Sequence, residues 1–262
     1  MRILISNDDG IFADGIIALR ERLEKCDFIE KLFIVAPDRE RSAIGHGITM
    51  HRPLRAREVN YKSAKSVGWS VDGTPADCVK LALEELLEEP PDLVLSGINM
   101  GPNLGTDVLY SGTVSAAVEA VICGIPSVAI SLASYKNHDF TAAADFAAGL
   151  APVVKKEGMP PGTLLNVNVP PGKPLGLRVV RLGNMRYINI FDKRTDPRGR
   201  EYYWMAGEVQ DLEDNCPETD VGSSREGYIT ITPVQIDLTN NCEMERIKSW
   251  GIGFDLRPGA NV

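Results

Sequence analysis

Short apolar segments alternate with helical patterns through the first two thirds of the chain. The apolar segments are too short for helices, and their many β-branched side chains are typical of buried strands in a parallel sheet. They lie at residues 3–5, 31–36, 92–96, 127–131 and 163–169, with a shorter one at 69–71. Helical patterns lie between them at residues 15–25, 76–88, 114–122 and 140–156. This alternation predicts repeated strand–helix–strand units with right-handed crossovers.

The predicted fold is therefore α/β, a Rossmann-like three-layer αβα core with a mostly parallel sheet. The glycines at positions 10 and 15 do not fit G-x-G-x-x-G, so a dinucleotide fingerprint is absent from the first turn. The pattern changes after residue 176. Residues 177–190 and 201–206 are strand-like and are joined by a basic turn, which predicts a C-terminal β-hairpin extension.

Tyr202, Tyr203 and Trp204 lie in the second strand of this hairpin, near its predicted base. Exposed aromatic side chains favour protein interfaces, so the hairpin is a candidate oligomer contact. A hairpin packed on its own domain is the alternative.

Composition narrows the classes of function. The chain has 262 residues and a formal net charge of −8, which argues against a general nucleic-acid binder and against a nucleic-acid duplex as partner. No apolar run approaches the ~20 residues needed to cross a bilayer, so we expect no membrane partner and a cytoplasmic location. The five cysteines are scattered without a C-x-x-C pair, so neither a disulfide framework nor a zinc site is predicted.

Two adjacent carboxylates, Asp8 and Asp9, follow the first strand in the turn-forming run Ser6 to Gly10. In open α/β sheets, ligands bind at the carboxyl ends of the strands. Adjacent carboxylates close to a core repel each other and need a counter-charge, which a divalent cation that prefers oxygen ligands supplies. The alternative is that one aspartate caps the next helix and the other is solvated.

The loop after the second strand leaves the same edge of the predicted sheet. Its Ser42 offers a hydroxyl oxygen to a metal or a phosphate, and Arg39 and Arg41 offer forked donors to phosphate oxygens. The alternative for the arginines is a solvated charged loop. His46 is a candidate proton donor or, alternatively, a hydrogen-bonded loop residue.

A glycine-rich loop follows the strand at residues 92–96. Asn99 offers an amide oxygen that fits an oxygen-only coordination shell, and Asn103 can hydrogen-bond a phosphate oxygen. Ser111, Gly112 and Thr113 begin the next helix, where exposed N–H groups and the helix dipole favour an anion. A plain N-cap by Ser111 or Thr113 is the alternative.

Taken together, four of these segments resemble the SurE family of survival-protein nucleotidases in order and spacing. They are residues 7–10, 38–42, 96–103 and 110–113. The resemblance implies a divalent-metal-dependent phosphomonoesterase, a 5′/3′-nucleotidase acting on nucleoside 5′- and 3′-monophosphates and, in some members, on polyphosphate. Residue 43 departs from the family pattern, since Ala43 stands where the family often has glycine after the serine.

Carried over motif by motif, the resemblance implies a metal held by four side chains, those of Asp8, Asp9, Ser42 and Asn99. It implies a phosphate site formed by Asn103, Ser111, Gly112 and Thr113. This oxygen-only donor set suits one Mg²⁺ or Mn²⁺ ion rather than zinc. Asp8 and Asp9 are then the predicted catalytic residues, with a metal-activated water as nucleophile; Asp8 as a covalent nucleophile stays open.

The resemblance also divides the chain into a catalytic core, residues 1–175, and an extension, residues 176–262. The extension holds the hairpin, a last core strand at residues 227–233 and a C-terminal oligomerisation segment, which implies a homodimer or homotetramer. Two other functions stay open: a nucleotide or phosphate sensor without turnover, and a calcium-dependent nucleoside hydrolase. No aromatic clamp for a nucleobase can be assigned from the sequence, although Tyr110 is near the expected phosphate loop.

Overall fold

Six parallel strands form the centre of a nine-stranded sheet in the part of the chain that the computed structural model describes, residues 1–136, 138–205 and 207–252. In chain order these strands are β1 (Arg2–Ser6), β2 (Lys31–Pro37), β4 (Ser66–Val71), β5 (Leu93–Met100), β6 (Ser127–Leu132) and β7 (Thr163–Val169). Their spatial order is β4-β2-β1-β5-β6-β7. Because all six run in the same direction, their carboxyl ends meet along one edge of the sheet.

Antiparallel pairing begins on both sides of this parallel centre. On one side, β3 (Ala56–Val59) pairs antiparallel with β4. On the other, β13 (Ile229–Gln235) pairs antiparallel with β7, and the short β8 (Leu177–Val179) lies beside β13 at the outer edge. The C-terminal segment therefore completes the main sheet as well as forming an extension.

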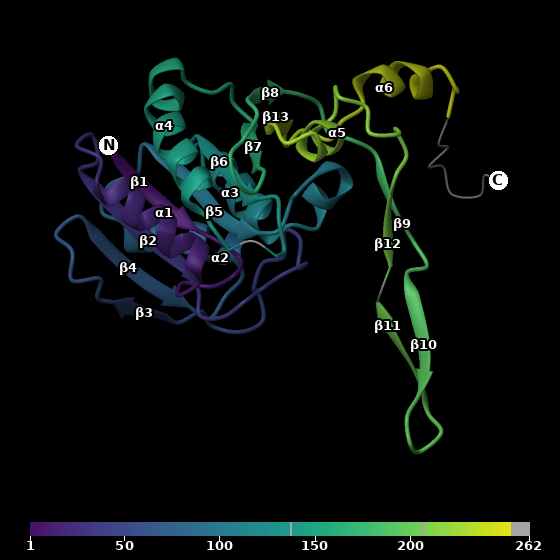
Figure 1. Cartoon of the computed structure of the whole chain (residues 1–262), viewed down its shortest axis with the longest axis horizontal. Helices are drawn as coiled ribbons and strands as arrows, with labels where there is room; N and C mark the ends of the chain where they lie inside the picture. The colour runs from purple at the N-terminus through teal and green to yellow at the C-terminus, as the bar shows by residue number, and fades with distance from the viewer. Residues whose placement is uncertain (137, 206, 253–262) are drawn as a thin grey trace, which may run out of the picture.

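Helices cover both faces of the sheet (Figure 1). Successive side chains of a strand point to opposite faces, and β1 illustrates this. Ile3 and Ile5 belong to one apolar cluster with α1 (Asp14–Glu24) and α4 (Thr141–Glu157). Leu4 belongs to another cluster, with α2 (Pro75–Leu81), the π-helical turn Ala82–Leu86 that continues it, and α3 (Gly112–Ile122). The predicted three-layer αβα core is confirmed.

The extension forms a long arm that projects from the core (Figure 1). Its inner ribbon pairs β9 (Met185–Ile188) with β12 (Glu208–Asp211), and its outer ribbon pairs β10 (Phe191–Thr195) with β11 (Glu201–Met205). The helices α5 (Asp220–Arg225) and α6 (Asn241–Lys248) complete the described C-terminal part. Residues 206 and 253–262, which the prediction placed in the hairpin and the extension, lie outside the described residues.

Two details of the predicted hairpin are wrong. Residues 177–190 do not form one strand, because β8 joins the main sheet and the arm begins at Met185. Tyr202, Tyr203 and Trp204 lie in the outer ribbon, opposite residues 192–194, rather than at the base of the arm, where Met185 pairs with Asp211. Both β8 and β9 have short strand-like sequences, so the sequence does not show where one ends and the other begins. They are distinguished only because β8 pairs with β13, about fifty residues later in the chain.

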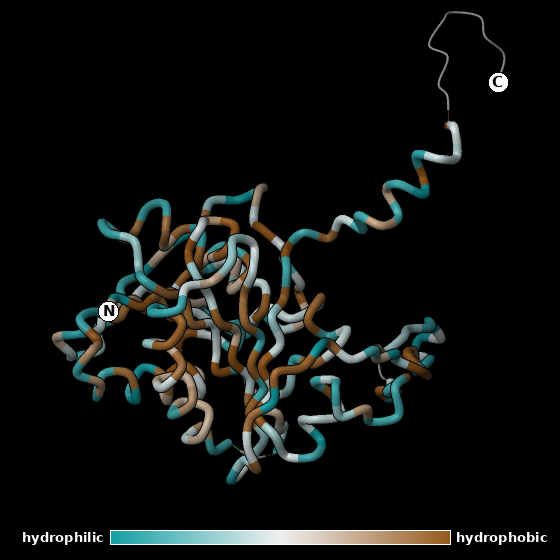
Figure 2. The backbone as a smooth tube through the Cα atoms, turned by 90° about the horizontal axis from the view of Figure 1, so that it is seen from above, coloured by the Kyte–Doolittle hydropathy of each residue, from teal (hydrophilic) through white to brown (hydrophobic). Residues whose placement is uncertain are grey.

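Hydrophobic segments concentrate inside the core, whereas the arm and α6 are mixed in hydropathy (Figure 2). In the described part of the chain, every helix is too short or too polar to cross a lipid bilayer. All five cysteines are free, as the scattered spacing predicted.

Candidate metal and phosphate site

The carboxylate of Asp8 lies against the N-terminus of α3. Its side chain is only 5% exposed, and its Oδ1 accepts a hydrogen bond from the hydroxyl of Thr113. Backbone N–H groups of Gly112 and Thr113 also donate hydrogen bonds to it, as expected where a helix N-terminus meets an anion. Burial nevertheless raises the pKa of Asp8, because the charged form loses hydration, and these hydrogen bonds offset part of that rise.

This contact requires glycine at position 112 because a larger residue would not fit, and not because of the backbone conformation. A Cβ atom at position 112 would lie 2.7 Å from Cβ of Asp8 and 2.8 Å from its Oδ2. No side chain fits between the helix N-terminus and the aspartate. The loop at the end of β1 and the first turn of α3 therefore meet through a glycine.

Asp9 lies beside Asp8 and faces the end of β5. Its Oδ2 accepts a hydrogen bond from the backbone N–H of Met100 at 3.2 Å. Burial, and then the neighbouring charge of Asp8, raise the pKa of Asp9 to about 6. No cationic side chain of the described residues is among the causes that act on the pKa of either aspartate. A buried and a half-buried carboxylate without such a partner fit a metal cation, which would supply the missing positive charge.

The loop after β2 contacts the same place. The backbone N–H of Arg41 donates a 2.7 Å hydrogen bond to the backbone oxygen of Asp8. Ser42 is exposed, and its hydroxyl donates to Oε1 of Glu40 at 2.6 Å. The charge of Glu40, which is exposed, contributes to the raised pKa of Asp9 after burial and the charge of Asp8. Sequence reasoning considered the arginines of this loop and missed Glu40, although its position between them was visible.

Asn99 lies inside β5 rather than in the loop that follows it, and it pairs with Ser131 of β6 after a register shift. Its side-chain N–H donates to the backbone oxygen of Gly101 at 2.8 Å. The amide oxygen, the predicted metal ligand, takes no part in this hydrogen bond. The next residue, Met100, contacts Asp9. The predicted ligand Asn99 is therefore adjacent in sequence to a direct contact of the acidic pair.

The predicted phosphate residues are engaged in different ways. Asn103 is buried and donates from its side chain to the hydroxyl of Ser131 at 2.7 Å. Ser111 is the N-cap of α3, because its hydroxyl accepts from the N–H of Val114 at 3.1 Å. Thr113 is fully buried and bonded to Asp8. A phosphate role for Thr113 would require its hydroxyl to exchange partners, and the roles of all these residues stay predictions.

His46, whose role the sequence left open, is paired with a buried glutamate. Its Nε2 lies 2.7 Å from Oε2 of Glu119, a residue of α3 that is only 3% exposed. Lys80 of α2 donates to the other oxygen of Glu119 at 2.8 Å. No local pattern indicates this cluster, because its members come from a loop and two helices that only the fold brings together.

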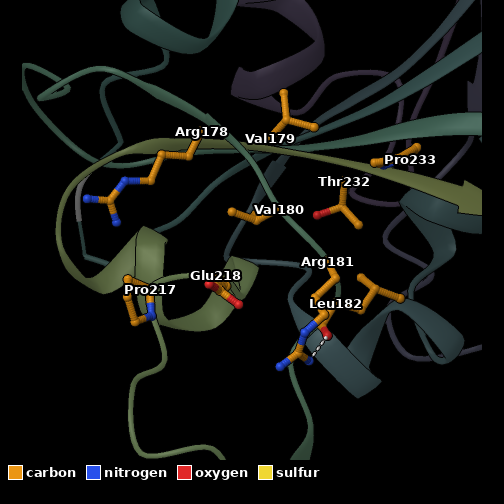
Figure 3. A pocket seen from close by; sticks show the side chains of 9 residues that line it. All are labelled: Arg178, Val179, Val180, Arg181, Leu182, Pro217, Glu218, Thr232 and Pro233. Atoms are coloured by element: carbon orange, nitrogen blue, oxygen red, sulfur yellow. Dashed lines mark hydrogen bonds between the residues drawn. The ribbon is translucent and has the colours of Figure 1, made fainter.

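A groove of about 930 Å³ lies away from the acidic pair, along β8 and β13 and over Pro217 and Glu218 (Figure 3). Arg178 and Arg181 project from its wall, and Arg181 bonds the backbone oxygen of Leu182 and ion-pairs with Glu213. None of the predicted site residues lines this groove. We therefore place the candidate site at the carboxyl ends of β1, β2 and β5, where the acidic pair and the N-terminus of α3 meet.

A family model described as "Survival protein SurE" matches residues 3–189 of the chain, which include every predicted site residue. The chain belongs to the SurE family. Curated SurE relatives match almost the whole chain. One from Pelotomaculum thermopropionicum, named 5′-nucleotidase SurE, is 64% identical over 248 residues, which are 95% of this chain and 94% of that protein. Another of the same name, from Desulforudis audaxviator, is 58% identical and covers 97% of this chain and 99% of its own length.

A solved SurE protein from Aquifex aeolicus has the same fold. It superposes with a TM-score of 0.82 at 41% sequence identity, covering 95% of this chain and 99% of that chain. The resemblance seen in four short motifs is thus confirmed over nearly the full length of the SurE chain.

Proposed function

We propose that this SurE protein is a divalent-metal-dependent phosphomonoesterase that releases phosphate from nucleoside 5′- and 3′-monophosphates. The main support is the acidic pair at the end of β1: two carboxylates with raised pKa values and no cationic side chain among the causes of those shifts. The name 5′-nucleotidase carried by the curated relatives supports the reaction class. Activity on 3′-monophosphates and polyphosphate extends the proposal beyond that name.

We propose that Asp8, Asp9, Ser42 and Asn99 hold the ion, which is Mg²⁺ or Mn²⁺ because all four donors are oxygen atoms. When bound, such an ion polarises a phosphoryl oxygen and lowers the pKa of a coordinated water. Hydroxyl and N–H groups at Ser111, Gly112 and Thr113, with the amide of Asn103, would bind the phosphate oxygens and stabilise their charge.

The position of Asp8 favours water over this aspartate as the nucleophile. Its carboxylate is buried and receives hydrogen bonds from the hydroxyl of Thr113 and from the first turn of α3. A covalent nucleophile needs an oxygen that can approach the phosphorus, and Oδ1 of Asp8 is already occupied by the hydroxyl of Thr113. We therefore propose that Asp8 and Asp9 bind the ion and that a water molecule attacks the phosphorus in line with the leaving oxygen.

The test is phosphate release from 5′- and 3′-mononucleotides and from polyphosphate, with Mg²⁺, Mn²⁺ or Ca²⁺. We expect release from mononucleotides that depends on Mg²⁺ or Mn²⁺, and a loss of about a hundredfold or more in kcat/KM for Asp8→Asn. Asp27→Asn, an exposed aspartate after α1, is the matched control and should keep full activity. Circular dichroism would confirm that both variants are folded.

Two other outcomes would contradict this proposal. Nucleotide binding without phosphate release, under any of the three metals, would identify a sensor. Free base rather than phosphate as the product would identify a nucleoside hydrolase.

We also propose that the chain forms a homodimer or homotetramer through its C-terminal extension. The outer ribbon of the arm exposes Phe191, Tyr203, Trp204 and Met205, each more than half accessible. None of the residues of α6 is buried. A projecting arm and an unburied amphipathic helix gain stability by packing against a second copy.

A further inference from the structure

A second cavity lies beside the candidate phosphate site, between the loop after β5 and the base of the arm. Its volume is about 290 Å³, at the small end of pockets that bind small molecules. Pro102 and Asp107 form part of one wall, and Tyr187 of β9 forms part of the other. Tyr135, from the loop after β6, also lines it. The cavity therefore lies at the junction of the core and the extension.

The cavity is connected to the acidic pair through the backbone. Pro102 follows Met100, whose N–H bonds Asp9, by two residues. The backbone oxygen of Asp107 accepts a hydrogen bond from the N–H of Ser111, the N-cap of α3, at 3.0 Å. The loop that lines the cavity thus begins at the predicted metal ligands and ends at the predicted phosphate donors.

Aromatic side chains gather around one carboxylate in this cavity. The hydroxyl of Tyr187 donates to Oδ1 of Asp107 at 2.6 Å, and the charge of Asp107 also acts on Tyr135. Tyr110 is close enough to act electrostatically on Tyr187. The ring of Tyr135 rests on Gly101, where a Cβ atom would lie 2.2 Å from the ring. Of the two tyrosines that line the cavity, Tyr135 nevertheless exposes 69% of its surface and Tyr187 36%, so aromatic surface remains accessible.

Asp107 itself has acceptor capacity left. Among the described residues, only Tyr187 hydrogen-bonds its side chain, through Oδ1. A half-buried carboxylate beside aromatic rings suits a flat ligand that carries an N–H donor. Adenine, guanine and cytosine present an exocyclic amino group, whereas the base of inosine monophosphate has a carbonyl where adenine has its amino group.

We propose that this cavity binds the base of the nucleotide, with Tyr135 and Tyr187 as its aromatic walls and Asp107 as the acceptor for an exocyclic amino group. This proposal rests on the proposed nucleotidase function. It names the base as the part of the nucleotide by which the enzyme distinguishes one substrate from another. A base enters here while its phosphate lies at the N-terminus of α3. The aromatic walls favour purines, because a two-ring base has more surface to stack.

The test compares kcat/KM for AMP, IMP and ribose 5-phosphate, which has no base. We expect Tyr135→Ala and Tyr187→Ala to lower kcat/KM for AMP about tenfold, mainly by raising KM, because each stacking contact contributes that order of binding. Activity on ribose 5-phosphate should not change. Phe28→Ala, an aromatic residue in the loop after α1, is the matched control and should leave both activities unchanged.

Asp107→Asn tests the acceptor separately. Its ratio of kcat/KM for AMP over IMP should fall at least fivefold, while its activity on ribose 5-phosphate stays that of the wild type. Tyr187→Phe, which removes only the hydroxyl that bonds Asp107, should keep its activity on AMP within about threefold, since the stacking face remains.

Failure of the base site and failure of the nucleotidase proposal give different results. If the wild type hydrolyses AMP but the tyrosine variants lose the same factor on AMP and ribose 5-phosphate, or lose nothing, the base site is wrong and the nucleotidase stands. If the wild type releases no phosphate from any substrate, the nucleotidase proposal fails. Calorimetric binding of adenosine then decides the base site: weaker binding by Tyr135→Ala supports it, and equal or absent binding overturns it.

Discussion

At the scale of single residues, the acidic pair is held in place before any ion arrives. Asp8 is fixed by Thr113 and by N–H groups of α3, and Asp9 by the N–H of Met100. These contacts hold both carboxylates in place while leaving the repulsion between the two charges in force. A cation bound between the two carboxylates, as proposed above, would relieve this repulsion.

Substituting Gly112 tests the close contact between α3 and Asp8. We expect Gly112→Ala to lower kcat/KM by about tenfold to a hundredfold, because the new Cβ atom displaces a predicted metal ligand. The matched control is Gly149→Ala on α4, where a Cβ atom meets nothing within 4 Å. That variant should keep full activity and gain up to about 1 kcal/mol of stability. Equal activities of the two variants would contradict the assigned contact.

The raised pKa of Asp9 predicts how metal binding depends on pH. Below about pH 6 the side chain of Asp9 is protonated, and a cation must displace that proton to bind. The dissociation constant for Mn²⁺ should be constant from pH 7 to 8 and should rise about tenfold for each pH unit below 6. Electron spin resonance of free Mn²⁺, without nucleotide, measures this directly. A constant affinity down to pH 5 would contradict it.

At the scale of elements, α3 links three parts of the molecule. Its first turn contacts Asp8, and two turns later Glu119 binds Lys80 of α2 and His46 of the loop that carries Ser42. The N–H of Gly45 also donates to the backbone oxygen of Tyr110, just before the helix. The helix thus positions both the acidic pair and the neighbouring loop.

Removing Glu119 should loosen this arrangement. We expect Glu119→Ala to lower the free energy of unfolding by about 2 kcal/mol, because two charge-assisted hydrogen bonds are lost from a buried position. Tm should fall by about 4–8 °C. Thermal unfolding followed by circular dichroism measures the change, with the exposed Glu88→Ala as control. A Tm equal to that of the control would show that the cluster does not stabilise the fold.

The sequence predicts the local elements well and their distant contacts poorly. Apolar runs such as Ile3 to Ile5 fix the parallel strands, and the run after β1 points to the acidic pair, because both signals are contained in a few adjacent residues. The pairing of β8 with β13, the contact of His46 with Glu119 and the meeting of Tyr135 with Tyr187 involve residues that are distant along the chain. A single sequence carries no local signal for them.

At the scale of the whole molecule, the arm connects the cavity proposed for the nucleobase with the proposed contact between subunits. Its inner ribbon supplies Tyr187 and Val209 to the cavity, and its outer ribbon exposes aromatic side chains. Thr106 bonds the backbone oxygen of Met185, and Asp220 accepts from the N–H groups of Gly105 and Gly183. The arm is therefore fastened at its base to the loop that leads to the phosphate site.

A charge placed on the outer ribbon tests the proposed assembly. We expect Trp204→Glu, at a side chain that is 59% exposed, to reduce the mass measured by light scattering to that of one chain, because a buried charge is costly. Val153→Glu, on the outer side of α4, is the matched control and should leave the assembly intact. The same mass for both variants and the wild type would place the subunit contact elsewhere.

The late position of β13 in the chain has a consequence for synthesis on the ribosome. Strand β7 ends at Val169 and gains its antiparallel neighbour only when residues 229–235 have emerged. Until then the nascent chain has an edge strand with unpaired backbone N–H and C=O groups. Such edges promote aggregation of incompletely folded chains. Messages that stop before codon 229 should therefore yield insoluble polypeptides, even though every predicted metal and phosphate ligand has already been translated.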